Sequence, residues 1–528
     1  MADKNYYLSQ NVKAEPLFNQ WYAWPSLISP ATAAMNTAFS HVKIMKSYLM
    51  SPAAHAAAIR NPAMRGGPFI DYSGERVDEI KSLLGRTLGE QAHMIEFAEA
   101  IRALNELLGS EARGYSIEGF YSRAPEALKG YIELAYDLNN YPAVRLIEPL
   151  LYRSRYYDDT RQSVSLSLIR DDERPFAFSS PVLEDDRHLH VRIPFNSEVM
   201  RELFRWRDEA KPLGYIRERL GVGNEQADLL GSFLTEGPAK DQSRFEGDGL
   251  RMRYFGHACV LLESGGVSLL TDPLISYRYD AEFPRYSYAD LPAVIDYVLI
   301  THSHSDHLVL ESLLQIRHKV RHVVVPRNSG GSLQDPSLRL ILENIGFDSV
   351  IEIDEMQSIN TGGGLVTSLP FLGEHADLNI RSKNAYLVRL AGRSILFAAD
   401  SSNLDPKLYR HIHNETGDVD TLFLGMECDG APLSWMYSQI FTRPLDRRSD
   451  QLRRLSGSDY ERAIGIVNEL NPTSVYVYAM GQEPWLGYIT AITYTEESKP
   501  IVESNRLVEE CRRRGITSER LFGHKEIF

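Results

Sequence analysis

The feature that most constrains this chain is the six-residue run HSHSDH at positions 302–307, which directly follows the apolar segment Tyr297 to Ile300. An extended backbone alternates its side chains, so His302 and His304 point to one side. A turn into a helix then presents Asp306 and His307 to a neighbouring point. A polar surface loop with accidental histidines is the alternative, but three of the chain's 15 histidines stand here beside an aspartate. The run therefore predicts two adjacent metal sites supplied by one loop.

Composition excludes several classes of protein. The 528 residues carry 57 Lys and Arg against 71 Asp and Glu, a formal net charge of −14. A net acidic surface repels phosphates, so nucleic acid is not an expected partner. No run of ~18 apolar residues occurs and the first residues lack the pattern of a signal peptide, so neither a membrane span nor export is expected. Three widely spaced cysteines, Cys259, Cys428 and Cys511, form no CxxC motif, and we expect a reduced, cytoplasmic protein.

A change in sequence texture near residue 245 predicts two domains. The polar stretch 235–242 contains a Gly-Pro breaker, and such dipeptides mark turns and loops. Residues 1–245 are dominated by helix-period segments such as Gln91 to Leu108, with a strand-like stretch at His188 to Phe195. We therefore expect a mainly helical α+β N-terminal domain.

Residues 246–528 have the pattern of an α/β domain. Short apolar or alternating runs separated by Gly, Asp and Asn turns predict strands. The segments Asp335 to Asn344, with Pro336 at its first helical position, and Asp459 to Leu470 predict helices. The predicted strands are Arg251 to Leu262, Ser268 to Thr271, Tyr297 to Thr301, His322 to Val325, Ala385 to Leu390, Ser394 to Ala398, Leu422 to Leu424 and Ser474 to Tyr478. Sheets covered by helices are expected.

Several motifs make this region resemble the metallo-β-lactamase superfamily. They are the HxHxDH signature at 302–307, FGHA at 255–258 on the opening strand, TDP at 271–273 closing the next strand, and AAD at 398–400 after a later strand. The resemblance covers roughly residues 250 to 528. It implies an αββα sandwich with a dinuclear metal site at one edge, in which Asp400 bridges both metals.

The departures from the hydrolase pattern of that superfamily concern two further ligands. Zinc hydrolases usually take a histidine before the bridging Asp and another after it. In the first region either Glu374 or His375 could ligate. The late strand leads into a segment with no histidine, which leaves His524 as a weak candidate. Glu427 ends another strand and could face the second metal, although a salt-bridged Glu is an equal alternative. His411 and His413 are expected to be surface residues of a helix.

A ligand set of three histidines with Asp306, Glu374, Asp400 and Glu427 resembles carboxylate-bridged di-iron centres more than a histidine-rich zinc site. With the long N-terminal domain, this set makes the chain resemble the carrier-protein-associated β-hydroxylases of nonribosomal peptide assembly lines, which include the chloramphenicol-pathway β-hydroxylase.

The resemblance implies a specific site and activity. One iron is held by His302, His304 and Glu374, the other by Asp306, His307 and Glu427, with Asp400 bridging and Glu374 and Asp400 as catalytic residues. Glu374 is the ligand that we expect to move. The implied co-substrates are O2 and electrons from an external donor. The implied substrate is an aminoacyl thioester on a carrier domain, p-aminophenylalanyl in the chloramphenicol case, and the N-terminal domain is implied to dimerise and to shape the substrate approach.

A zinc or manganese hydrolase of the same fold, acting on a lactone, phosphodiester or thioester, is the alternative. Ligand type separates the two. If His375 and a late histidine such as His524 ligate in place of Glu374 and Glu427, the hydrolase is favoured.

Overall fold

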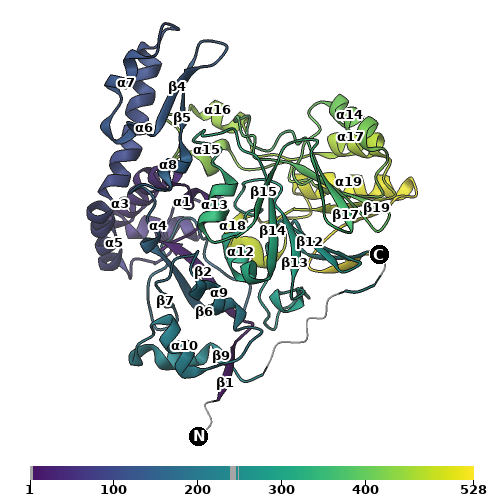
Figure 1. Ribbon diagram of the computed structural model, residues 1–528, viewed down its shortest axis with the longest axis horizontal. Coiled ribbons are helices and arrows are strands. Elements are labelled where there is room, and N and C mark those ends of the chain that lie inside the picture. Colours follow the sequence, from purple (N-terminus) through teal and green to yellow (C-terminus); the bar gives the residue numbers. More distant parts are fainter. Residues whose placement is uncertain (1–3, 238–244, 248, 528) are drawn as a thin grey trace.

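The computed structural model describes residues 4–237, 245–247 and 249–527. Part of the predicted boundary segment, residues 238–242, lies outside the described residues. The C-terminal half contains two seven-stranded sheets packed face to face (Figure 1).

The first sheet has the strand order β15-β14-β13-β12-β11-β10-β23. Neighbours from β12 to β15 run parallel, whereas β10, β11 and β23 pair antiparallel. Its strands are β10 (Arg251–Gly256), β11 (Cys259–Ser264), β12 (Val267–Thr271), β13 (Ile295–Leu299), β14 (Val320–Pro326), β15 (Val350–Ile353) and β23 (Lys525–Ile527).

The second sheet has the order β16-β17-β18-β19-β20-β21-β22 and is parallel from β19 to β22. Its strands are β16 (Ser358–Asn360), β17 (Gly364–Leu369), β18 (Ala385–Leu390), β19 (Arg393–Phe397), β20 (Thr421–Gly425), β21 (Ser474–Tyr478) and β22 (Thr517–Arg520).

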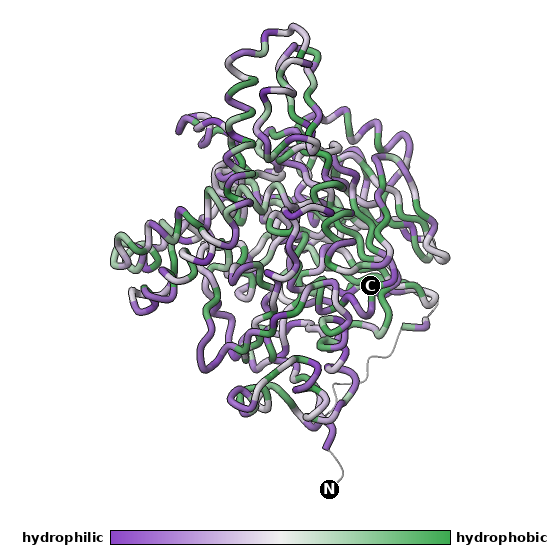
Figure 2. The backbone as a smooth tube through the Cα atoms, turned by 60° about the vertical axis from the view of Figure 1, so that its left-hand side comes forward, coloured by the Kyte–Doolittle hydropathy of each residue, from purple (hydrophilic) through white to green (hydrophobic). Residues whose placement is uncertain are grey.

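Buried side chains from both sheets, such as Leu299 and Phe423, form one core between them. Figure 2 shows hydrophobic residues concentrated in these central strands. Helices α14, α17 and α19 cover the outer face of the second sheet, and α12 and α13 cover the first. The helices of this half are α12 (Leu310–Ile316), α13 (Leu338–Asn344), α14 (Pro406–Thr416), α15 (Leu433–Tyr437), α16 (Arg447–Leu452), α17 (Tyr460–Leu470), α18 (Gly487–Thr490) and α19 (Lys499–Arg513). This is the expected αββα sandwich.

The strand predicted over Arg251 to Leu262 is instead a hairpin. Gly256 and His257 adopt positive φ angles of 111° and 52° and turn the chain between β10 and β11. The alternating apolar pattern continues through this tight turn because every residue in it is buried, so the sequence pattern does not reveal the break.

The helix predicted from Asp335 begins later, at Leu338. Ser337 is its cap and accepts a hydrogen bond from the Leu340 N–H. Asp335 is wholly buried and accepts from the Ser329 N–H (2.7 Å), so its carboxylate serves the preceding loop instead.

The N-terminal half is mainly helical with small sheets, as expected. Its sheets have the orders β3-β2-β6-β7, β8-β1-β9 and β4-β5. The helices are α1 (Pro25–Ile28), α2 (Pro30–Asn36), α3 (Val42–Met50), α4 (Pro52–Ile59), α5 (Val77–Glu90), α6 (Ala92–Glu111), α7 (Gly119–Arg123), α8 (Glu148–Leu151), α9 (Glu198–Arg205), α10 (Leu213–Leu220) and α11 (Ala227–Ser232). The strands are β1 (Asn5–Leu8), β2 (Val12–Phe18), β3 (Trp21–Tyr22), β4 (Ile132–Tyr136), β5 (Pro142–Leu146), β6 (Gln162–Leu168), β7 (Leu189–Val191), β8 (Lys211–Pro212) and β9 (Leu234–Thr235).

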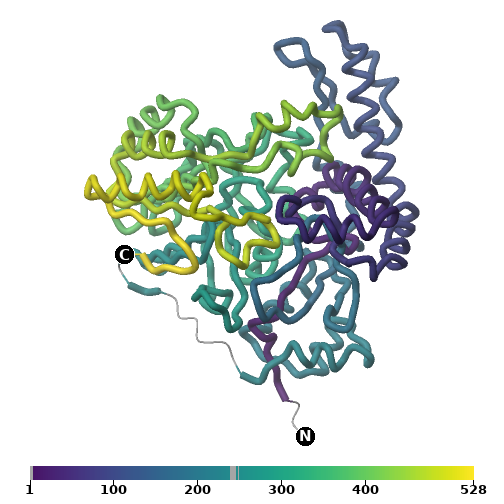
Figure 3. The backbone as a smooth tube through the Cα atoms, turned by 180° about the vertical axis from the view of Figure 1, so that it is seen from behind, coloured from purple at the N-terminus to yellow at the C-terminus, as the bar shows by residue number. Residues whose placement is uncertain are grey.

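The two halves share a hydrophobic core. Leu166 and Phe204 from the N-terminal half belong to the same buried cluster as Val298 and Leu313 from the first sheet and α12. Figure 3 shows the earliest segments, in purple and blue, on one side of the molecule and the green and yellow C-terminal segments on the other. None of the helices in the described ranges is long and apolar enough to cross a membrane.

Candidate metal centre

The HSHSDH loop begins where β13 leaves the first sheet. Thr301 is wholly buried and donates to Asp272 twice, from its backbone N–H (2.7 Å) and from its hydroxyl (2.6 Å). Asp272 directly follows the neighbouring strand β12, so these bonds hold the loop against the sheet. The loop then closes into a turn in which the His307 N–H donates to the His304 carbonyl (3.1 Å). One short turn thus holds all four ligands predicted in this run.

The structure brings six of the seven predicted ligands together. Their ligand atoms form overlapping groups within 4.8 Å: His302, His304 and Glu374; His302, His307 and Asp400; and His257, Asp306 and His307. The closest approaches join His304 Nδ1 to Glu374 Oε1 (2.7 Å) and His307 Nε2 to Asp400 Oδ2 (3.0 Å). The first group is the set that the resemblance implies for one iron.

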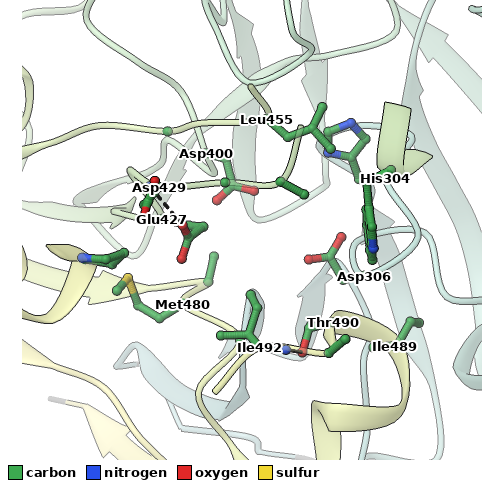
Figure 4. Close-up of a pocket in the computed structure, with 18 of the residues that line it drawn as sticks. His304, Asp306, Asp400, Glu427, Asp429, Leu455, Met480, Ile489, Thr490 and Ile492 are labelled. Atoms are coloured by element: carbon green, nitrogen blue, oxygen red, sulfur yellow. Dashed lines mark hydrogen bonds between the residues drawn. The ribbon is translucent and has the colours of Figure 1, made fainter. Parts of the chain in front are cut away.

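Three carboxylates come from the second sheet. Glu374 follows β17, Asp400 follows β19 and Glu427 follows β20. Because β19 and β20 are parallel, their carboxyl ends meet at one edge of the sheet. Figure 4 shows Asp400 and Glu427 on one side of a cavity, with Asp306 and His304 across from them. The two sheets therefore supply opposite walls of the site.

Glu374 lies on a strained loop. Gly373, Glu374, Ala376 and Asp377 all have positive φ, between 50° and 84°. A Cβ at Gly373 would lie 2.7 Å from Ser402 Cβ, so only glycine fits there. Backbone strain of this kind costs on the order of 1–3 kcal/mol per non-glycine residue and clusters at functional sites.

Glu427 lies at the cavity but outside those groups. Its Oε1 accepts from the Asp429 N–H (2.9 Å), and its Oε2 accepts from the Tyr494 hydroxyl. It lines the same cavity as Asp400 and Asp306. No Arg or Lys ion pair holds it among the described residues, which argues against the salt-bridge alternative.

The other histidines considered in the sequence analysis do not join the groups of ligand atoms. His375 is buried and stacks on His304 with ring centroids 4.4 Å apart, but belongs to none of the groups found among the described residues. His524 is exposed and packs edge-on against Tyr286. His411 is exposed on α14, and His413 of the same helix pairs with Asp418 (2.8 Å).

The outer ring nitrogens of two predicted ligands donate hydrogen bonds. His307 Nδ1 lies 2.9 Å from Asp272 Oδ2, and His302 Nδ1 lies 3.0 Å from the Thr301 hydroxyl, whose own proton goes to Asp272. A proton on the outer nitrogen leaves the inner lone pair free for a metal. Asp272 and His257 received no site role from the sequence, although the TDP and FGHA motifs contain them. Tyr494 and Tyr437, which lies 3.1 Å from His304 Nε2, carry no sequence signal.

The electrostatics of the site favour a bound cation. Burial raises the pKa of Glu374 to about 7, against the opposing effect of His304, and raises the pKa of Glu427 to about 8. Burial also lowers the pKa of the His302 imidazole far below its ordinary value. Although burial opposes it, the neighbouring His257 and His307 hold the pKa of Asp306 below its usual range. Although burial opposes it, Glu374 raises the pKa of His304, and Asp400 and Asp272 raise the pKa of His307. A metal cation would take the place of the protons that these nitrogens and carboxylates hold.

The residues fit a pair of iron ions. His302 Nε2, Glu374 Oε2 and Asp400 Oδ1 are buried and make no hydrogen bond within the part of the chain that the structure describes. Buried polar atoms without partners are rare in folded proteins and call for an unseen ligand. Imidazole nitrogens combined with carboxylate oxygens suit iron.

The centre lies in a cavity of about 470 Å³. Part of its wall is apolar, with Trp435, Met436, Leu455, Ile489 and Ile492. The N-terminal half reaches this wall through Arg65, whose Nη1 donates to the Thr493 hydroxyl (2.7 Å). A pocket with an apolar wall and a few convergent polar groups can orient an apolar substrate group and exclude water.

Fold and centre together define a metallo-β-lactamase-fold protein with a carboxylate-rich dinuclear site. The diiron non-heme β-hydroxylase N-terminal domain family matches residues 7–238, and the β-lactamase superfamily domain matches residues 268–476. A relative from Streptomyces venezuelae, the 4-amino-L-phenylalanyl-[CmlP-peptidyl-carrier-protein] 3-hydroxylase, is 41% identical over 98% of both chains. The crystal structure of CmlA, a diiron β-hydroxylase from the same organism, has a TM-score of 0.93, 39% identity and complete coverage of both chains.

The chain belongs to the CmlA-like diiron β-hydroxylases. It is an oxygenase whose cofactor is a pair of iron ions, as the resemblance implied, and the hydrolase alternative has no better support.

Proposed function

We propose that the chain is an O2-dependent monooxygenase that hydroxylates the β-carbon of an aromatic aminoacyl group carried as a thioester on a nonribosomal peptide synthetase carrier domain, in antibiotic biosynthesis. The observation that carries the proposal is the identity of 41%, which extends over 98% of both chains and so includes the domain outside the metal fold. The apolar wall of the cavity supports an aromatic side chain as the group that is held there.

We assign the ligands as His302, His304 and Glu374 for one iron and Asp306, His307 and Glu427 for the other, with Asp400 between them. The groups within 4.8 Å support the first set and the position of Asp400 beside His302 and His307. Glu427 is the least direct assignment, because its carboxylate is held by Tyr494 and the Asp429 N–H.

The iron pair supplies O2 activation: one oxygen atom enters the substrate C–H bond and the other leaves as water, with two electrons and two protons from an external donor. The chain's own residues position the substrate and the metal ligands and shield the site from water. Trp435, Met436 and Ile489 hold the side chain of the aminoacyl group and keep water from it. Asp272 fixes the His307 ring through its Nδ1, which keeps the inner nitrogen directed at Asp400.

We propose that residues 1–245 and 246–528 are two domains packed against each other, the first shaping the substrate approach through Arg65 and mediating a homodimer. The arm built from α6, α7, β4 and β5 projects from the body of the molecule (Figure 1) and exposes Tyr115, Leu138 and Tyr141. Exposed apolar residues gathered on one projection are typical of protein interfaces. Light scattering tests the dimer.

We place the enzyme in the cytoplasm with its carrier domain. All three cysteines are free and buried, which suits a reducing compartment.

Metal content tests the proposal first. Protein purified without added metal is analysed for elements, and an absorption scan follows reduction with dithionite and exposure to O2. We expect two irons per chain, a reversible spectral change, and one hydroxylation per chain on a p-aminophenylalanyl-loaded carrier domain. Asp400→Asn should abolish turnover, whereas Asp405→Asn, an exposed carboxylate before α14, should not. Two zincs with no redox response after iron reconstitution would overturn the proposal.

A further inference from the structure

His257 lies at the turn between β10 and β11 and is 2% exposed. Its backbone is fixed on both sides: the His257 N–H donates to Glu483 Oε1 (3.2 Å), and its carbonyl accepts from the Ala479 N–H (2.9 Å). Glu483 Oε1 also accepts from the Tyr254 hydroxyl. The turn therefore holds the imidazole in one place beside the HSHSDH loop.

The two ring nitrogens of His257 face different groups. The Gly481 N–H donates to Nδ1 (3.2 Å), and Nε2 lies 3.2 Å from Asp306 Oδ2. A nitrogen that accepts a hydrogen bond from a backbone amide uses its lone pair for it and carries no proton. In the neutral ring the proton is then on Nε2, and this nitrogen lies 3.2 Å from the Asp306 carboxylate.

This arrangement is the reverse of that in the predicted ligands. His302 and His307 have donors on their outer nitrogens and free lone pairs facing inward. His257 has its lone pair facing outward, toward Gly481, and its proton facing inward. Proximity alone makes His257, Asp306 and His307 a group able to hold a metal, but a protonated Nε2 has no lone pair to give to it.

We propose that His257 is a positioning residue, not a ligand: its protonated Nε2 lies against Asp306 and thereby fixes which carboxylate oxygen faces the second iron. The inference rests on the proposed ligand role of Asp306. Partners of this kind typically change metal affinity 10–100-fold when they are lost.

Two substitutions distinguish the role of Nε2, which faces Asp306, from the role of Nδ1, which faces Gly481. His257→Gln has an amide long enough to donate to Asp306. His257→Asn tolerates the positive φ and can accept from the Gly481 N–H, but is too short to reach Asp306. We expect His257→Gln to keep two irons per chain and release them to a chelator within a few-fold of the wild-type rate. His257→Asn should release iron 10–100-fold faster. His55→Gln, a buried histidine of the N-terminal half bonded to the Ile70 N–H (2.9 Å), is the matched control and should release iron as the wild type does.

Pulsed EPR of the one-electron-reduced centre provides the readout that a general loss of stability does not change. The imidazole nitrogen couplings of His257→Gln should match those of the wild type. Loss of one set of couplings in that variant would make His257 a ligand and overturn the proposal, as would wild-type iron release by His257→Asn. A wild type that binds zinc instead of iron overturns the proposed function alone, because zinc release by the same variants still tests His257.

Discussion

At the scale of single residues, close polar contacts decide which way the carboxylates of the centre face. Asp306 faces His257, Glu374 faces His304, and Glu427 faces the hydroxyl of Tyr494. Tyr494 comes from the loop between α18 and α19, which lines the cavity. Glu427 therefore depends on a residue outside the metal-binding loops.

Replacement of Tyr494 by Phe removes only the hydroxyl that Glu427 accepts from. A hydrogen bond to a charged group contributes about 1.5–3 kcal/mol, which corresponds to roughly 10–100-fold in rate if it is needed in the reaction. We expect Tyr494→Phe to retain two irons per chain, because the other ligands remain, and to hydroxylate at least tenfold more slowly. Single-turnover product analysis with parallel iron determination measures both. Wild-type turnover would show that the Glu427 to Tyr494 bond has no functional role.

Another buried residue predicts how stability depends on pH. His41 is 5% exposed and stacks on Trp21 at 4.0 Å, and burial lowers its pKa to about 3. Since an unfolded histidine has a pKa of ~6.5, the unfolded state binds more protons below that pH, and stability falls as the pH drops from 6.5 toward 3. The loss at pH 5 is about 2 kcal/mol. His41→Phe keeps the stacking but cannot be protonated, so its unfolding temperature should fall less between pH 8 and pH 5 in calorimetry. Equal slopes for both proteins would contradict this origin.

The ligands differ in how far the sequence alone can predict them. The HSHSDH ligands are predictable because one loop supplies them at fixed spacing. Glu374 and His375 are adjacent and equally suited to bind a metal, so only the backbone can decide between them. With a φ of 69° at Glu374, its carboxylate meets His304 Nδ1, while the His375 ring stacks behind the same histidine.

At the scale of elements, the loop 62–67 of the N-terminal half and the loop 491–498 meet at the cavity. The Gly66 carbonyl accepts from Trp435 Nε1 (3.2 Å), and Arg65 bonds Thr493. Gly66 has a φ of 74°, and a Cβ there would lie 2.8 Å from Ala491 Cβ. This glycine allows the two loops to approach each other.

Gly66→Ala should separate these loops and widen the entrance to the cavity. We expect the KM for the carrier-bound substrate to rise several-fold while kcat changes less, because the iron ligands are not touched. Gly74→Ala is the matched control: its φ is 87°, but the added Cβ would meet Pro52 Cβ at an ordinary 3.5 Å. Steady-state kinetics of both variants measure the effect. An equal rise in KM for both variants would mean that backbone strain causes it, and not the contact between loops 62–67 and 491–498.

Element prediction succeeds where burial follows apolar character. The strands at Ala385 to Leu390 and Ser474 to Tyr478 are β18 and β21 with the predicted limits. Strand β2 cannot be predicted in this way. Its sequence VKAEPLF is buried at every position although it contains Lys13, Glu15 and Pro16. Those charges are tolerated because Glu15 pairs with both Lys13 (2.7 Å) and the buried Arg174 (2.9 Å). Partners distant in sequence cannot be read from the local pattern.

At the scale of the whole molecule, one buried arginine joins the two halves. Arg174 Nη2 lies 2.9 Å from Glu15 on β2 and 2.9 Å from Glu311 on α12. Its guanidinium also lies over the Tyr488 ring of α18, 3.4 Å from the centroid. Because α12 begins three residues after His307, the N-terminal half holds the helix that follows the metal loop.

Arg174→Met leaves the buried carboxylates of Glu15 and Glu311 without their shared cation. Removal of one partner from a buried pair costs about 3–5 kcal/mol, so calorimetry should show a clearly lower unfolding temperature. Since α12 loses its anchor, iron release to a chelator should also accelerate, although Arg174 touches no proposed ligand. Arg123→Met removes an exposed pair with Glu111 on the projecting arm and should change neither quantity. A variant that loses stability but keeps the wild-type rate of iron release would mean that the N-terminal half supports the fold without acting on the metal centre.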